Sequence, residues 1–283
     1  MKISVLTPSY NSGKFIERAI QSVLHQDYDD IEHIVVDGGS SDKTLEILKR
    51  YNHLKWISEK DKGQSDAMNK AFKMATGDII VYLNADDYFN PKVFHTVIDY
   101  FTQDEVLDIL VGNLYLTYVE STKIRFVNSE YRFKKMLLDF KYGFPYNPVC
   151  YFYKRKVQEK VGPFPLDNHY VMDVWFILNA FETHLVQKTE LVLGNYYNTG
   201  ANKSSHMQET NLVQSYVRNF IKKENQYRFY YYFNFIFYRI GHFFRVDLKL
   251  IFKFIIIKVV QPKKKMSLKD LKTLTFKEAL TDK

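Results

Sequence analysis

The sequence predicts an α/β protein with a mixed, mostly parallel sheet flanked by helices and a C-terminal amphipathic helical tail. Strand-like and helix-like patterns alternate through the first 115 residues, which is typical of parallel strands joined by crossover helices. The strand-like segments end in polar or acidic residues. Beyond residue 221 the composition becomes strongly aromatic and basic, which indicates a separate tail.

The elements of the first half follow in a regular order. Short apolar runs predict strands over 3–7, 31–37, 54–58 and 79–83. Apolar residues at helical spacing predict helices over 13–26, 45–48, 65–75 and from about Pro91, the second of them capped by Ser41 or Asp42. The carboxyl ends of parallel strands share one edge of a sheet, so one crevice there should collect Thr7 to Asn11, Asp37, Asp61 and Asp86.

Length and charge limit the class of function. A chain of 283 residues is long enough for one α/β core, and we expect a main domain over 1–221 and a tail over 222–283. Residues 1–221 carry 25 basic and 27 acidic side chains, whereas the whole chain has a net charge of +8. The basic excess therefore belongs to the tail, and the main domain is not expected to bind nucleic acid.

Cysteine content and hydropathy narrow the cellular setting. Cys150 is the single cysteine, which excludes an internal disulfide and a cysteine-rich zinc site and favours a reducing compartment. The opening MKISVLTPSYN turns polar too soon for a signal peptide and is expected to form a strand. No run reaches about 18 uncharged apolar residues, so no transmembrane helix is predicted.

The segment GDIIVYLNADDY is the most informative part of the chain. A buried strand there ends in Asn84, Asp86 and Asp87. Adjacent carboxylates at a strand end provide the hard oxygen ligands that suit a divalent cation carrying phosphates. Alternatively, Asp86 and Asp87 cap the helix expected near Pro91.

Four segments together carry a resemblance to a known family: SVLTPSYNSGKFIERAIQSVLHQ, HIVVDGGSSDKT, SEKDKGQSDAMNKAF and GDIIVYLNADD. In this order they resemble the successive motifs of family 2 glycosyltransferases of the GT-A fold, closely over about 2–115 and more loosely to about 205. The resemblance implies that residues 1–115 bind a nucleoside diphosphate sugar donor and that 116–221 receive the acceptor. It also implies that a metal ion, Mn²⁺ or Mg²⁺, bridges the donor diphosphate to a D-x-D motif.

Asn84 occupies the first position of that motif, so Asp86 is the expected metal ligand. Asp37 precedes two glycines that let the backbone approach a ligand closely, and it matches the family's contact to the base or ribose. The other expected donor contacts are Thr7, Pro8, Tyr10, Asn11, Asp61, Gly63, Gln64, Asn84 and Asp87. Alternative roles remain open: Asp37 in turn formation, Tyr10 in the core, and Asp61 as an exposed loop charge.

A catalytic base is expected in the second half. The segment NPVCYFYKRKVQEKVGPFPLDNHYVMDVWFILNA resembles the family region that supplies this carboxylate, and the matching residue is Asp173. An inverting transfer needs one base within hydrogen-bond reach of the acceptor hydroxyl. Asp173 can also serve as a helix N-cap, and Asp167 is the second candidate for the base.

Two further features concern the polar loop that holds His206 and the chain length of the product. His206 lies in a polar loop that resembles the family's flexible segment, and it is either a further metal ligand or a solvated surface residue. No Q-x-x-R-W sequence follows Asp173, although processive synthases of this family usually carry one. A single addition is therefore favoured over polymerisation.

The tail has the pattern of a membrane-surface helix. Residues 222–265 carry 11 basic side chains against two acidic ones, and residues 227–254 hold 13 aromatics. Apolar residues recur at three- and four-residue steps beside a stripe formed by Arg245, Lys249 and Lys253. Such helices lie in the interface of anionic membranes. The alternative is a helix packed on the main domain with its cations in water.

These observations predict a metal-dependent, inverting, non-processive hexosyltransferase in the cytoplasm, held peripherally at the inner membrane face. It would transfer a hexose or N-acetylhexosamine, with UDP as the first expectation for the nucleotide. The expected acceptor is a lipid-linked glycan in surface polysaccharide assembly. Two alternatives stay open, namely a sugar-nucleotide pyrophosphorylase and a non-catalytic membrane-binding module.

Overall fold

The computed structural model describes residues 1–119, 121–129, 131–138, 144–167, 171–200, 202 and 209–223. The chain divides into two compact units, Met1–Phe220 and Ile221–Lys283, and the fold described below is that of the first. The predicted tail helix and His206 lie outside the described residues. Within the described segments no helix is both long and apolar enough to cross a membrane.

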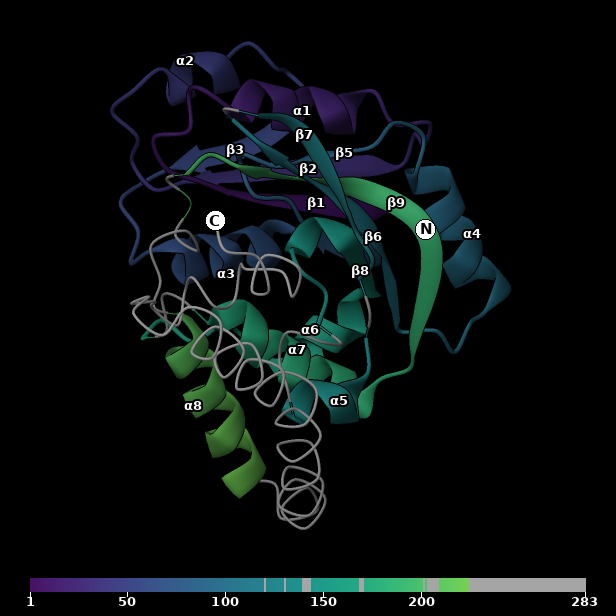
Figure 1. The fold of residues 1–283 in the computed structure, drawn as a ribbon. Coiled ribbons are helices and arrows are strands. Elements are labelled where there is room, and N and C mark those ends of the chain that lie inside the picture. The colour runs from purple at the N-terminus through teal and green to yellow at the C-terminus, as the bar shows by residue number, and fades with distance from the viewer. Residues whose placement is uncertain are drawn as a thin grey trace, which may run out of the picture. The chain divides into compact units, whose positions relative to one another are not determined.

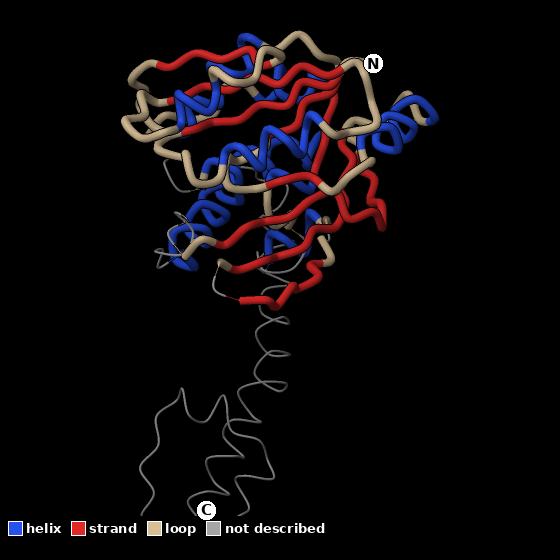
Figure 2. Tube along the Cα trace, turned by 90° about the horizontal axis from the view of Figure 1, so that it is seen from above, coloured by secondary structure: helices blue, strands red, loops and turns tan. Residues whose placement is uncertain are grey.

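The described strands form one nine-stranded sheet in the order β3-β2-β1-β4-β8-β6-β9-β5, with β7 paired to β6. Their bounds are β1 Ile3–Ser9, β2 Ile31–Asp37, β3 Leu54–Ser58, β4 Ile79–Tyr82, β5 Tyr88–Phe89, β6 Ile109–Tyr118, β7 Ser121–Val127, β8 Tyr151–Lys154 and β9 Val186–Asn198. Figure 2 shows these strands as a twisted layer with helices on either side.

The helices are α1 Ile16–Leu24, α2 Thr44–Leu48, α3 Gln64–Met74, α4 Phe94–Gln103, α5 Phe133–Leu138, α6 Arg155–Val161, α7 Met172–Thr183 and α8 Glu209–Lys223, with a short 3₁₀ turn η1 at Pro148–Cys150. Figure 1 shows α1 and α2 above the parallel strands and α3 below them. On the upper face Ile16 and Ile20 of α1 share a buried cluster with Ile47 and Leu48 of α2 and with Val35 of β2. The sheet is thus covered on both sides, as its continuously apolar strands require.

The parallel half of the sheet aligns its strand ends. Strands β1, β2, β3 and β4 pair in parallel, and the register sets Ser9 opposite Asp37 and Asp37 opposite Ser58. The side chains that follow these strands therefore meet at one edge. This is the edge at which an open α/β sheet binds its ligands.

Most predicted elements of this half are confirmed within a few residues. Asp42, rather than Ser41, receives the backbone N–H of Thr44 at the start of α2. The helix expected near Pro91 begins later, at Phe94, because Lys92 adopts a left-handed backbone conformation with φ of 57°. The N-cap residue of α4 is Val93, whose side chain makes no capping hydrogen bond.

The other half of the sheet, in which β6 and β9 pair in parallel and the remaining pairs are antiparallel, brings distant segments beside the strand-end edge. Strand β8 pairs with β4 and β6, and the two-residue strand β5 pairs with β9 through Tyr88 opposite Asn195. The segment that follows β4 is thereby held against the end of β9, about a hundred residues later in the chain. This pairing sets the surroundings of Asp86 and Asp87.

Candidate active site

Asp37 closes the turn after β2. Its Oδ2 accepts hydrogen bonds from the N–H of Ser40 at 2.8 Å, from the N–H of Gly39 at 3.1 Å and from Ser58 Oγ at 2.7 Å. Its Oδ1 accepts a short hydrogen bond from Ser40 Oγ, and the residue is fully buried. Gly39 has a φ of 83°, a conformation that glycine adopts at little cost. The carboxylate thus shapes the turn, and its contact to a donor stays a prediction.

The loop before α3 packs directly against this turn. Asp61 Oδ1 accepts from the N–H of Gly63 at 2.8 Å, and its Oδ2 lies where a Cβ on Gly38 would come within 2.7 Å. A side chain at Gly38 would therefore displace Asp61. The two loops therefore lie together at the strand-end edge, and Asp61 is half-buried rather than a free surface charge.

The end of β1 contributes residues of differing exposure. Thr7 is buried, and its Oγ1 lies 2.9 Å from Nε2 of His33 in the neighbouring strand β2. Pro8 is buried as well. Tyr10 is 66% exposed, which leaves its ring available to a ligand. Asn11 has a φ of 47° and accepts from the N–H of Ser41 through Oδ1 at 2.9 Å.

Asp87 is fully buried and its oxygens are occupied by protein donors. Oδ2 accepts from Asn84 Nδ2 and from Asn147 Nδ2, each at 2.9 Å, and Oδ1 accepts from the N–H of Tyr197 at 2.9 Å. Asn84 in turn accepts through Oδ1 from Gln64 Nε2 at 3.1 Å. Asp87 therefore joins the donor half to η1 and to β9.

Asp86 is half-buried, and its surroundings differ from those of Asp87. Its Oδ2 accepts from Asn202 Nδ2 at 2.7 Å, and its main-chain oxygen accepts from Arg18 Nη2 at 2.9 Å. Asn202 comes from the loop after β9, 116 residues further along the chain. Asp86 thus lies where α1, β5 and this loop come together.

Burial raises the pKa of both aspartates. For Asp87 the negative charge of Asp86 raises the pKa further, against the lowering effect of its three hydrogen-bond donors. For Asp86 the positive charge of Arg18 works in the opposite direction from burial. Two adjacent buried carboxylates that hold their protons more tightly than usual would gain from a nearby cation.

Asp173 lies in the first turn of α7 and not at its N-cap, which is Val171. Its Oδ1 accepts from the N–H of Val174 at 2.8 Å, and burial raises its pKa. The preceding residue, Met172, accepts through Sδ from Ser65 Oγ at 3.3 Å, so the first turns of α7 and α3 are in contact. Gln64, next to Ser65, donates to Asn84 at the strand-end edge. The start of α7, which holds Asp173, is therefore connected to that edge through Met172 and the start of α3. Asp167, the second candidate, is exposed.

Comparison with known proteins identifies the family. The description "Glycosyl transferase family 2" belongs to the family model that matches residues 4–162, more than half of the chain. The chain belongs to glycosyl transferase family 2. Its relatives include an uncharacterized glycosyltransferase of Nostoc, alr2836, 36% identical over 40% of this chain, and the chondroitin synthase of Escherichia coli, 37% identical over 36% of it.

The matched regions span only 38% and 16% of those two relatives. Solved structures agree on the fold. Staphylococcus aureus TarS in complex with UDP-GlcNAc is similar with a TM-score of 0.63 at 20% identity, over 78% of this chain and 65% of that one. The mannosyltransferase PcManGT of Pyrobaculum calidifontis, in complex with GDP-Man and Mn²⁺, gives 0.53 at 20% identity, over 72% and 59%. The mixed, GT-A-like sheet is therefore confirmed.

A divalent cation fits this site only if a bound substrate and water supply most of its oxygen ligands. Among the described residues no three His, Cys, Asp or Glu side chains converge on one point. The oxygens of Asp87 are taken, which leaves Asp86 as the available carboxylate. A single carboxylate with phosphate oxygens and water is a common way to hold Mg²⁺.

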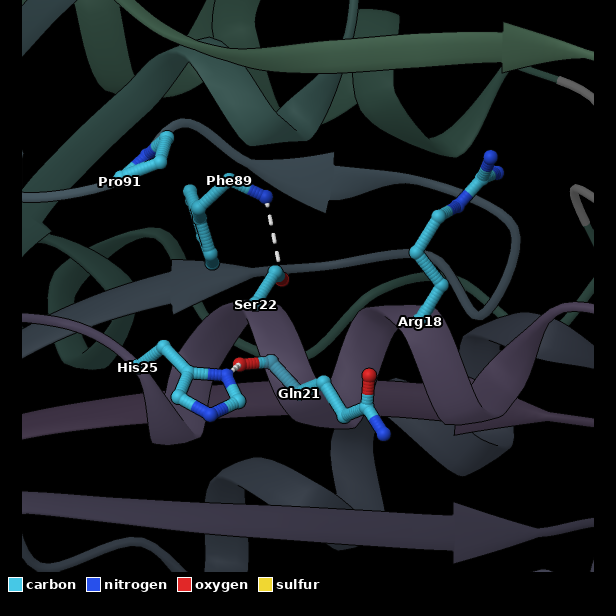
Figure 3. Close-up of a pocket in the computed structure, with 6 residues that line it drawn as sticks. All are labelled: Arg18, Gln21, Ser22, His25, Phe89 and Pro91. Atoms are coloured by element: carbon cyan, nitrogen blue, oxygen red, sulfur yellow. Dashed lines mark hydrogen bonds between the residues drawn. The ribbon is translucent and has the colours of Figure 1, made fainter.

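Four residues that sequence reasoning did not select contact the two aspartates: Arg18, Asn147, Tyr197 and Asn202. Arg18 also lines a hollow between α1 and the β5 segment, with Gln21, Ser22, His25, Phe89 and Pro91 (Figure 3). Arg18 lies within the segment SVLTPSYNSGKFIERAIQSVLHQ, but it is not one of the apolar residues whose spacing predicts the helix there. Nothing local marked the other three residues.

Proposed function

We propose that the chain is a metal-dependent, inverting, non-processive glycosyltransferase that transfers a hexose or N-acetylhexosamine from a UDP-linked donor to a lipid-linked or other glycan acceptor. Family membership supports sugar transfer from a nucleotide sugar. The half-buried Asp86 at the strand-end edge is the observation that carries the assignment of the donor site.

The names of similar proteins support the finer choice of donor and pathway. The fold neighbour TarS is described in complex with UDP-GlcNAc, and two relatives are named as a chondroitin synthase and a poly(ribitol-phosphate) β-N-acetylglucosaminyltransferase. A polymeric surface glycan is therefore the kind of product we propose.

In this proposal Asp86 holds the divalent metal, Mn²⁺ or Mg²⁺, at the donor diphosphate. The metal, when bound, neutralises the negative charge that develops on the leaving nucleoside diphosphate. Asp87 keeps Asn84, Asn147 and the start of the loop after Tyr197 in place beneath it. The exposed ring of Tyr10 and the turn closed by Asp37 supply contacts to the nucleoside.

Asp173 is the proposed base. It takes the proton of the acceptor hydroxyl as that oxygen forms a bond to the anomeric carbon, while the bond from this carbon to the diphosphate breaks on the opposite face. A raised pKa brings a carboxylate closer to the pKa that favours proton transfer near neutral pH.

A thermal-shift panel tests the donor assignment. The full-length protein is heated with UDP-, GDP- and dTDP-sugars, each with and without Mn²⁺, and UDP-sugars with Mn²⁺ should raise the melting temperature most because ligands stabilise the native state by mass action. Asp86→Ala should lose the Mn²⁺-dependent part of the shift. An unchanged shift in that variant would refute the role of Asp86, and no shift with any nucleotide sugar would refute the function.

The proposal places the protein at the inner face of the cytoplasmic membrane through its basic, aromatic tail. Binding of the intact chain to anionic vesicles should weaken with salt, because exposed charges are screened within about 10 Å at 0.1 M. Replacing Lys263, Lys264 and Lys265 by Gln should weaken it further. Equal binding to neutral and anionic vesicles would contradict the electrostatic part of this proposal.

A further inference from the structure

The Arg18 side chain of α1 contacts two tyrosine rings and the main chain beside the aspartate pair. Its guanidinium carbon lies 3.9 Å from the ring centre of Tyr197 and 4.3 Å from that of Tyr88. Its Nη2 donates to the main-chain oxygen of Asp86 at 2.9 Å. Figure 3 shows the side chain extending from α1 toward β5. One cation on α1 thus contacts two segments that are far apart in the sequence, residues 86–88 and Tyr197.

The Arg18 cation is only partly satisfied by its surroundings. Its Nε is buried and bonds to no described atom, and no ion pair of Arg18 occurs within the described part of the chain. A half-buried cation without an ion pair costs free energy. The offset available here comes from the two tyrosine rings and from the nearby charge of Asp86.

Both tyrosines are tied to the aspartate pair. Tyr88 follows Asp87 directly and opens β5, and the N–H of Tyr197 donates to Asp87 Oδ1. Phe15, just before α1, also packs on Tyr197, with ring centres 5.9 Å apart. Moving the Arg18 guanidinium would therefore release the main chain at Asp86 and the end of β9 together.

We infer that Arg18 is a positioning residue that fixes the main chain at Asp86 and so aims its carboxylate into the donor site. The inference rests on the proposed role of Asp86 at the donor diphosphate. Residues that orient a metal ligand typically change metal affinity by about 10- to 100-fold when they are mutated.

Arg155 provides a matched control at the opposite edge of the sheet. Its Nε donates to the main-chain oxygen of Gly77 at 2.9 Å, its guanidinium carbon lies 5.2 Å from the ring centre of Phe72, and its Nη2 is buried without a partner. It makes the same kinds of contact as Arg18, at the amino ends of the strands. Arg155→Gln therefore reports the purely structural cost of losing such a contact set.

The experiment compares full-length Arg18→Gln, Arg18→Lys and Arg155→Gln with the unmodified protein. Mn²⁺ is titrated at saturating UDP, and amide hydrogen exchange is followed over residues 84–90. Arg18→Gln should weaken Mn²⁺ binding by about 10- to 100-fold and speed exchange over 84–90, whereas Arg155→Gln should change Mn²⁺ affinity less than about twofold. Arg18→Lys keeps the charge without the planar stacking and should fall between the two, and it replaces Arg18→Gln if the latter does not fold.

The outcomes separate this inference from the proposed function. Equal Mn²⁺ affinity and equal exchange in the Arg18 and Arg155 variants would overturn the positioning role while the function stands. If the unmodified protein binds no UDP with Mn²⁺, the proposed function fails. Hydrogen exchange then decides only whether Arg18 fixes the main chain at Asp86: faster exchange over 84–90 in the Arg18 variants alone supports this contact, and its absence overturns it.

Discussion

Carboxylates at the two edges of the parallel sheet differ in their hydrogen-bond and ion-pair partners. At the amino ends of the strands, Glu32 Oε1 accepts from Ser4 Oγ at 2.6 Å and from the N–H groups of Thr76 and Gly77, and Oε2 lies 2.7 Å from Lys55 Nζ and 3.3 Å from Lys2 Nζ. At the carboxyl ends, Asp86 and Asp87 are adjacent, and the described residues place the cation of Arg18 near them.

The pKa directions express this difference. Burial alone would raise the pKa of Glu32, but hydrogen bonds from Lys55, Ser4 and Thr76 outweigh it and hold the pKa well below its usual range. Burial raises the pKa of Asp86 and Asp87, and there the opposing contacts do not outweigh it. The carboxylate at one edge is satisfied within the protein, whereas at the other edge the charged form of the two aspartates is disfavoured and would be stabilised by a bound cation.

The largest effect should separate the two edges by activity. Asp86→Asn should lower sugar transfer by about 100- to 1,000-fold, since it removes the charge that we propose to lie at the leaving diphosphate. Glu32→Gln, matched in chemistry, should stay within a few-fold of the unmodified rate. Initial rates of UDP-sugar turnover at saturating Mn²⁺ measure both. Comparable losses in the two variants would break the distinction between the edges.

The next effect concerns Asp173, in the first turn of α7, which contacts α3 through Met172 and Ser65. Asp173→Asn nearly keeps the shape and removes the proposed base, so transfer should fall by about 100-fold while donor binding is preserved. Transfer rates and UDP-sugar thermal shifts, taken on the same preparation, check the two halves of this prediction. Near-normal transfer would move the base elsewhere, with Asp167 the next residue to replace.

Stability should reverse the ranking of the two edges. Glu32→Gln weakens a buried set of charge-assisted hydrogen bonds and should lower the free energy of unfolding by about 2 kcal/mol. Asp86→Asn removes a poorly solvated charge and should change that free energy by less than about 0.5 kcal/mol, or raise it. Urea unfolding at pH 7 measures both. A larger loss in Asp86→Asn would contradict the stated division of roles.

The smallest and sharpest test is the pH dependence of those two differences. The folded pKa of Glu32 lies below its ordinary value of 4.5, so its stabilising contribution is fully present above that pH and is lost as the pH falls further. The destabilisation by Glu32→Gln should therefore shrink in acid. The folded pKa of Asp86 lies above its ordinary value of 3.8, so Asp86→Asn should gain stability relative to the unmodified protein as the pH rises above that value. Unfolding midpoints measured between pH 3 and 7 test both signs.

The parallel half of the fold was predictable because its signals are local. Each of its strands is a short apolar run, and the alternation with helices determines both their direction and the edge at which Asp37 and Asp86 lie. Helix α4 was placed too early because the left-handed Lys92 does not follow from the apolar pattern.

The surroundings of the aspartates were not predictable for the opposite reason. Asn202 and Tyr197 reach Asp86 and Asp87 across more than a hundred residues, through the pairing of β5 with β9. No local pattern encodes such a pairing. Arg18 was present in a recognised motif, yet helical spacing alone cannot tell a solvated arginine from one held between two tyrosine rings.

The single cysteine gives this chain a chemical reporter at its own site. Cys150 is buried in η1, its Sγ donates to the main-chain oxygen of Asn147 at 2.9 Å, and burial raises the pKa of the thiol to about 11. A thiol that is shielded and protonated at neutral pH reacts slowly with alkylating reagents. The rate at which Cys150 is labelled therefore reports how often η1 opens, the turn that holds Asn147 against Asp87. A second cysteine introduced on the surface would accept a fluorophore almost without competition from Cys150.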